Sequence, residues 1–218
     1  MAIQVCEAFA YHPWNDTLKE ALEFGNIAGL WFSVENISHK IRYSYMDAIT
    51  KAYSENFCKK IGTWCRKHNI SYIGHVIEDN NTHAKTGRGT GHYFRALEGQ
   101  DMSGIDVVLQ QIVPGLTECS NAGYVGYNHM ENEFFHYYLG KLASSLAHID
   151  EKKKGRAMCE IFGAFGWAEG LPFMKGLSDI MLASGINHFV PHAFSPKEED
   201  TDCPPHFYNG GRNIQYPL

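Results

Sequence analysis

The stretch "CRKHNISYIGHVIED", residues 65–79, joins the end of a long helical pattern to a short apolar run that ends in two carboxylates. Apolar and aromatic residues recur every four positions over residues 41–68, which predicts a long amphipathic helix. The apolar run at 70–77 that follows is typical of a buried strand. The acidic pair Glu78 and Asp79 therefore stands where a predicted strand ends.

The same order of helix and apolar strand returns twice in the second half of the chain. A helix predicted over 131–149 leads to the strand candidate "RAMCEIFGAFGW", residues 156–167. A further helix, with Pro172 near its first turn and Gly185 suited to a left-handed C-cap, leads to "INHFVPHAF", residues 186–194. These segments predict alternating helices and strands.

Two more strand candidates are "IQVCEAFAY", residues 3–11, and "IDVVLQQIV", residues 105–113. In the second of these, the polar Gln110 and Gln111 leave a helix open. Strands separated by helices of this length cannot form hairpins, so they are expected to lie parallel with right-handed crossovers. The predicted fold class is α/β.

Acidic or imidazole side chains end four of the predicted strands: Glu7, Glu78 with Asp79, Glu160, and His192. In a TIM barrel the carboxyl ends of the strands bring such residues to one face. An open nucleotide-binding sheet would need a glycine-rich turn between a strand and a helix, and "GRGTGH", residues 87–92, has neither that spacing nor a preceding strand. A (β/α)8 barrel type is favoured.

The glutamates interrupt apolar strands, where an unpaired buried carboxylate costs several kcal/mol. A single carboxylate at a strand end serves equally well as a helix N-cap or an ion-pair partner. Strand alternation places Glu78 on the inward face and His75 and Asp79 on the more apolar outward face. Two facing carboxylates are the groups that glycoside hydrolysis requires, one as proton donor and one as nucleophile or base.

Sugars also bind to flat aromatic side chains and to many hydrogen-bonding groups. Trp14 follows Glu7, and Trp167 follows Glu160, both in predicted loops after strands. Tyr93, Arg95 and His192 are in comparable positions. Trp64, within the long helix, and Trp31 are instead expected in the core.

The stretches "RYSYMDAITKAYSENFCKKIGTWCRKHNISYIGHVIED", "GHYFRALEGQDMSGIDVVLQQIVPG", "RAMCEIFGAFGWAEG", "GINHFVPHAFSP" and "DCPPHFYNGGRN" carry a resemblance. Together they resemble the catalytic TIM barrel of large bacterial glycoside hydrolases, of the α-L-rhamnosidase type (family 106-like) and more distantly of family 2 and clan A. The resemblance implies that Glu78 matches a catalytic acid and Glu160 the second catalytic carboxylate. Glu7 falls where such proteins often carry an Asp-Glu-Pro turn, but Cys6 and Ala8 flank it here.

The resemblance, together with the position of each side chain in the predicted elements, gives a set of expected substrate-binding residues: Glu7, Trp14, His75, Asp79, Arg95, Trp167, His192 and Asp202. A barrel of this kind takes about 250 residues, whereas five strand candidates are found in these 218. We therefore expect residues 1–218 to form a single, partial catalytic barrel from a larger enzyme. Its edges would be completed by a partner chain or in a homo-oligomer.

Composition excludes several other classes. The formal charge of −5 and the lack of a basic, aromatic-interleaved stripe argue against nucleic-acid binding. No stretch reaches the ~20 apolar residues that span a bilayer, and the amino terminus lacks a leader, so a cytoplasmic chain is expected, although a parent protein could carry an export signal. The six cysteines include no CxxC pair and are expected to be reduced, mostly buried thiols. The basic run "DEKKKGR", residues 150–156, is expected to be a solvated turn.

Two alternatives stay open beside a glycosidase that needs no cofactor. A metal-dependent TIM-barrel hydrolase would use His75, Asp79, His188 and His192 among the twelve histidines, but strand residues four apart are separated by about 13 Å. A structural calcium ion is conceivable, although no EF-hand ligand series is present. The second alternative is a non-catalytic barrel that binds carbohydrate without turnover.

Overall fold

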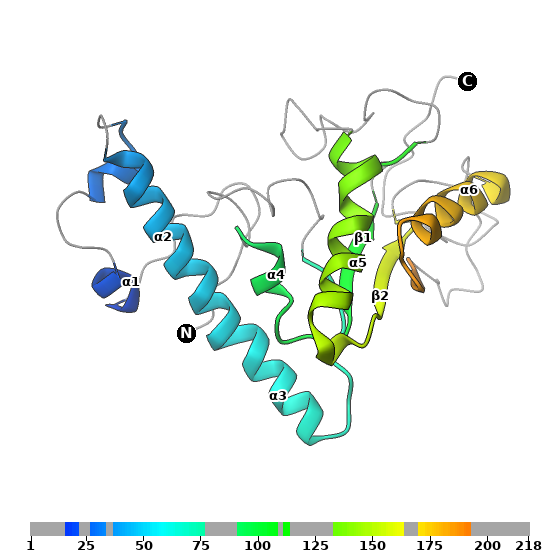
Figure 1. Ribbon diagram of the computed structural model, residues 1–218, viewed down its shortest axis with the longest axis horizontal. Coiled ribbons are helices and arrows are strands. Elements are labelled where there is room, and N and C mark those ends of the chain that lie inside the picture. Colours follow the sequence, from blue (N-terminus) through cyan, green and yellow to red (C-terminus); the bar gives the residue numbers. More distant parts are fainter. Residues whose placement is uncertain are drawn as a thin grey trace, which may run out of the picture. The chain divides into compact units, whose positions relative to one another are not determined.

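The computed structural model describes residues 16–21, 27–33, 37–76, 91–108, 111–113, 133–163 and 170–192. The chain divides into two compact units, which are treated separately below. Unit 1 comprises residues 1–72 and 82–100, and unit 2 comprises residues 73–81 and 101–218. The described elements are mixed α/β, and the parallel sheet lies in unit 2 (Figure 1).

The described part of unit 1 is helical. Its elements are α1 (Asp16–Ala21), the 3-10 turn η1 (Ile27–Leu30), α2 (Ser38–Tyr53), the π-helical turn η2 (Ser54–Cys58), α3 (Lys59–Lys67) and α4 (Tyr93–Ala96). Figure 1 shows α2 and α3 as one long helical rod, in blue to cyan. This confirms the helix predicted over 41–68, with η2 inside it and Asn69 in the left-handed region at its end (φ 55°).

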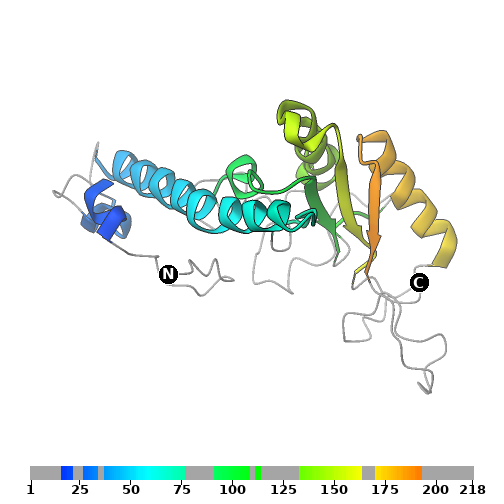
Figure 2. The same ribbon diagram turned by 90° about the horizontal axis from the view of Figure 1, so that it is seen from below.

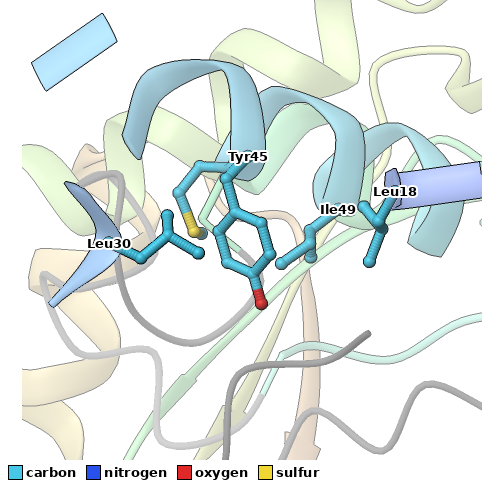
Figure 3. Close-up of a cluster of buried hydrophobic side chains, with 5 residues drawn as sticks. Leu18, Leu30, Tyr45 and Ile49 are labelled. Carbon is cyan, nitrogen blue, oxygen red and sulfur yellow. The ribbon is translucent and has the colours of Figure 1, made fainter. Parts of the chain in front are cut away.

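The core of unit 1 forms where α1 and η1 meet α2. Figure 3 shows Leu18, Leu30, Tyr45 and Ile49 converging, and Met46 completes the buried cluster. Burial of such side chains stabilises a helix far more than intrinsic propensity does. The recurrence of apolar residues every four positions therefore identified the face of α2 that packs against α1 and η1.

The expectation that Trp31 and Trp64 belong to the core is wrong, because each is 57% exposed. Trp64 lies on a face of α3 that points to solvent and stacks on His68, one turn later, with ring centroids 4.1 Å apart. Trp31 follows η1 on the outside of unit 1. Large aromatic residues on a helix are not buried by size alone, since the packing face decides their position.

Unit 2 is built on a three-stranded parallel sheet in the order β1-β2-β3. The strands are β1 (Ser103–Val107), β2 (Ala157–Ile161) and β3 (His188–Pro191), and Figure 2 shows them side by side. The helical elements are the π-helical turn η5 (Phe134–Leu139), α5 (Gly140–Ile149), the 3-10 turn η6 (Glu151–Lys153) and α6 (Gly170–Ala183). The predicted parallel strands with helical crossovers are therefore confirmed for these three strands. Of the strand candidate at 105–113, only residues 105–107 belong to a strand among the residues described there.

Apolar packing against the sheet explains why these segments adopt their structure. Helix α5 contacts β1 and β2, and all five residues of β1 are buried, as expected for a parallel sheet covered by helices. Helix α6 has Pro172 in its first turn and buries Leu177 and Met181. The predicted C-cap is also confirmed, since Gly185 has a φ of 98°.

The strand predicted at 70–77 is wrong over its described part, because residues 70–76 join no β-ladder. Gly74, with a φ of 154°, departs from strand geometry. It nevertheless lies directly against β1, since a Cβ atom on Gly104 would come within 1.7 Å of its carbonyl oxygen. Two glycines thus permit a backbone approach that side chains would forbid.

The basic run at 150–156 is not simply a solvated turn. Lys153 is fully buried, with 0% of its side chain exposed, and its ammonium nitrogen lies 3.5 Å from Oδ2 of Asp150. Burial lowers the pKa of Lys153 to about 8, against the attraction of Asp150. The charge pattern could not show this, because Lys152 and Lys154 beside it are more exposed and carry the same charge.

Three further expectations concern the cysteines, the strand candidate near the amino terminus and membrane-spanning segments. Cys58 and Cys159 are buried and Cys65 is half-buried, in keeping with the expected mostly buried cysteines, whereas Cys6, Cys119 and Cys203 lie outside the described residues. The strand candidate at 3–11 lies outside the described residues. Among the helices that the structure describes, none combines the length and the apolar character that crossing a bilayer needs.

Candidate active site

Two carboxylates face the same side of the sheet in unit 2. Asp106 of β1 and Glu160 of β2 are register partners, so their side chains share a face. His75 lies between them, with Nε2 3.3 Å from Oε2 of Glu160 and Nδ1 3.8 Å from Oδ2 of Asp106. Residues widely separated in sequence thus form one acid-imidazole-acid cluster.

The three side chains of the cluster differ in their exposure to solvent. The Asp106 side chain is 4% exposed, that of His75 is 21% exposed, and that of Glu160 is 27% exposed. A ligand from solvent would therefore meet Glu160 before the buried Asp106.

The surroundings of Glu160 favour its ionised form. A hydrogen bond from His75 lowers the pKa of Glu160 below its usual value, against the opposing effect of burial. The charges of His75 and His192 act in the same direction. Glu160 is consequently a carboxylate that could attack an electrophile or accept a proton, rather than a proton donor at neutral pH.

The approach of the two backbones places His75 in the cluster. The carbonyl of Gly74 sits against Gly104, two residues before Asp106 on β1. The Nδ1 atom of His75 also bonds the carbonyl oxygen of Val76 at 2.6 Å, which orients the ring. The strand alternation that assigned His75 to the outward face fails here because Gly74 does not have strand geometry.

His192 joins the same end of the sheet. Its backbone N–H donates to the carbonyl of Ile161 at 2.9 Å, so it extends the pairing of β3 with β2. A Cβ atom on Gly163 would lie 3.0 Å from Nδ1 of His192, which shows how closely the ring packs on the turn after β2. Glu160 and His192, predicted from separate strand ends, are thus brought together.

Arg95 has a structural role in unit 1. Its Nη1 atom donates to Oδ1 of Asp47 at 2.6 Å and to Oγ1 of Thr50 at 2.8 Å, which ties α4 to α2. These bonds use the N–H groups of Nη1. The remaining predicted site residues lie outside the described part of the chain: Glu7, Trp14, Glu78, Asp79, Trp167 and Asp202.

Asp106 was not among the predicted site residues. The sequence did contain a signal for it, because Asp106 interrupts the apolar strand "SGIDV" as Glu160 interrupts "AMCEI". The polar Gln110 and Gln111 in the same stretch also leave a helix open, which weakens that signal. Pairing of the two strands in register was needed to show that the two acids are neighbours.

The described residues contain no group of three His, Cys, Asp or Glu side chains placed to hold an ion, and Asp79, one of the ligands considered from sequence, lies outside them. His188 begins β3 and its ring bonds Oδ1 of Asn187 at 2.7 Å, whereas His192 follows the end of that strand. The two histidines thus stand at opposite ends of β3, as expected for strand residues.

Comparison of the chain with protein-family models, with curated proteins and with solved structures finds no match.

Proposed function

We propose that this chain is a glycoside hydrolase, or the catalytic part of one, in which Glu160 is the ionised carboxylate that attacks the anomeric carbon or activates water. The single observation that supports this most is the position of Glu160, partly exposed at the end of a parallel strand and hydrogen-bonded by His75. Glycosidases need such an ionised carboxylate opposite a protonated one.

Glu78 is the proton donor in this proposal. It follows His75 by three residues, so the segment that brings His75 to Glu160 also leads to Glu78. The donor must have a raised pKa, whereas the cluster lowers that of Glu160, and the two roles are therefore assigned to different carboxylates. His192 and the buried Asp106 complete the polar end of the site.

Within the α/β class, the fold that we propose is a partial TIM barrel. Parallel strands, helical crossovers and a polar cluster towards the strands' carboxyl ends support it, since barrel enzymes place their chemistry at that end. The substrate would be a carbohydrate, and a second copy or a partner chain would cover the open edges of the sheet.

Hydrolysis of a panel of aryl glycosides tests this function. We expect Glu160→Gln and Glu78→Gln each to lower kcat about a thousandfold, while Glu151→Gln, at an exposed position before β2, leaves it unchanged. If Glu160 is the nucleophile, azide restores turnover of Glu160→Gly and forms a glycosyl azide.

Unchanged hydrolysis in Glu160→Gln would refute the proposal. A wild-type chain that binds sugars but releases no aglycone would instead support the non-catalytic carbohydrate-binding alternative. Proton NMR of the first-formed sugar would distinguish retention from inversion of the anomeric centre.

A further inference from the structure

The hydrogen bonds of His75 define its protonation. Nδ1 lies 2.6 Å from the carbonyl oxygen of Val76, which can only accept, so Nδ1 carries a proton. Nε2 lies 3.3 Å from Oε2 of Glu160. When Glu160 is ionised its oxygen also only accepts, so Nε2 carries a proton as well, and the ring is an imidazolium.

An imidazolium in this position needs compensation, because its side chain is only 21% exposed. One negative charge comes from Glu160 itself. Asp106 adds a second carboxylate, whose Oδ2 lies 3.8 Å from Nδ1 of His75 and whose side chain is almost completely buried, so the three ionised groups together carry one net negative charge. Opposite charges at this separation favour the charged form of each partner strongly in a low-dielectric site.

We propose that Asp106 is a positioning residue, whose buried carboxylate holds His75 as an imidazolium so that Nε2–H keeps Glu160 ionised and fixes the direction of Oε2. The catalytic consequence of this inference rests on the proposed function. The charge interactions themselves involve only His75, Asp106 and Glu160, which the structure brings together. Asp106 acts through His75 and does not itself need to reach the substrate.

The position of Asp106 on the sheet supports a role of this kind. A carboxylate in the middle of a buried strand is unfavourable for folding compared with an apolar residue. All its neighbours on β1 are buried, and its register partner is Glu160. Within the described part of unit 2, the other titratable group that acts on Glu160 is His192, which follows β3.

The experiment uses the full chain labelled with 15N-histidine. Imidazole 15N shifts distinguish an imidazolium from a neutral ring, and His75→Gln assigns the signal. We expect the wild type at pH 7 to show both His75 nitrogens protonated. In Asp106→Asn, which keeps the shape but removes the charge, the pH at which the ring loses its second proton should fall by about one unit or more.

The matched control is Asp150→Asn, which removes a carboxylate from a lysine-bearing turn elsewhere in unit 2. It should leave the His75 signal unchanged. Asp106→Glu, which restores the carboxylate, should recover part of the fall in the pH at which His75 loses its second proton.

A neutral His75 in the wild type at pH 7 would overturn the proposal without any variant. An unchanged His75 signal in Asp106→Asn, or the same change in Asp150→Asn, would overturn it as well. Absence of hydrolysis by the wild type would refute the proposed function separately, since the NMR measurement does not depend on turnover.

Discussion

The sheet of unit 2 has a cluster of charged groups at each end, and the two clusters are built differently. At the amino end, Arg156 precedes β2, and its guanidinium donates to the carbonyl oxygens of Asp101 and Lys153 at 2.8 and 3.1 Å. Lys153 is buried beside Asp150. Towards the carboxyl end, His75, Asp106 and Glu160 direct their side chains at one another.

The difference lies in what each cluster holds in place. The cations of the amino-end cluster are tied to backbone carbonyls and to Asp150, so they define the turn that starts β2. The other cluster holds a side chain, Glu160, that remains partly open to solvent. In TIM-barrel enzymes the amino ends of the strands contribute to stability and the carboxyl ends to chemistry, so under the proposed barrel fold the two clusters have the roles expected of their ends. Charge and burial alone would not have separated the two.

The largest effect is expected from Gly104→Ala. The new methyl would lie 1.7 Å from the carbonyl oxygen of Gly74, and a backbone atom cannot move aside without shifting the segment that carries His75. The free energy of unfolding should fall by about 3 kcal/mol, and any hydrolysis should fall with it. Urea denaturation measures the first effect. Gly176→Ala, in α6 with open space around it, is the control and should stabilise by about 0.5 kcal/mol or more.

Asp150→Ala should impair stability but not the site. It removes the carboxylate beside the buried ammonium of Lys153, and also the acceptor for the backbone N–H of Lys152. We expect a loss of about 2 kcal/mol in the free energy of unfolding, with the His75 signal unchanged. Asp179→Ala removes an exposed ion pair with Lys175 and should cost less than about 0.5 kcal/mol. Equal losses in the two variants would contradict the structural role of Asp150.

Lys153→Met should have a smaller effect at pH 7, within about 1 kcal/mol, because an apolar side chain of similar length replaces a buried charge. The pH dependence is more informative. The pKa of Lys153 is about 8 in the folded chain and near 10.5 when unfolded, so between these values the unfolded state binds more protons. Stability of the wild type should therefore gain from this group as pH rises from about 8 to 10.5. Denaturation at several pH values should show that this contribution is lost in Lys153→Met.

The smallest effect concerns Glu160 and the acid range. Its pKa is lowered in the folded chain, so its ionised form adds stability above the ordinary glutamate value, and this is lost as pH falls through the lowered pKa. The difference in the free energy of unfolding between wild type and Glu160→Gln, below about 1 kcal/mol, should shrink on acidification. A difference that grows in acid would contradict the ion pair with His75.

Local patterns identified much of the fold. The four-residue recurrence of apolar side chains located the rod formed by α2 and α3, and the turn residues Pro172 and Gly185 located the ends of α6. These predictions succeeded because periodicity and caps act over one or two turns of chain. Glu160 could likewise be singled out, since a carboxylate in an apolar strand is costly wherever the strand packs.

The failures share a cause. His75 was assigned to the wrong face because alternation assumes a regular strand, and Gly74 interrupts it. Lys153 belongs to a basic run between a helix and a strand, which predicts a solvated turn, and Trp64 lies within a long amphipathic helix, which predicts a core position, but neither prediction holds. Each property depends on what packs against the residue from a distant part of the chain.

The helices over 38–67, 134–149 and 170–183, and a carboxylate near the end of β2, were determined by the sequence itself, since they follow from short-range periodicity and composition. The meeting of His75, Asp106 and Glu160 was decided only by the tertiary structure. Strand register paired the two acids, and the contact of Gly74 with Gly104 positioned the imidazole between them. Those distances depend on packing between segments that no local pattern relates, which is why the chemistry of the cluster appears only in the folded chain.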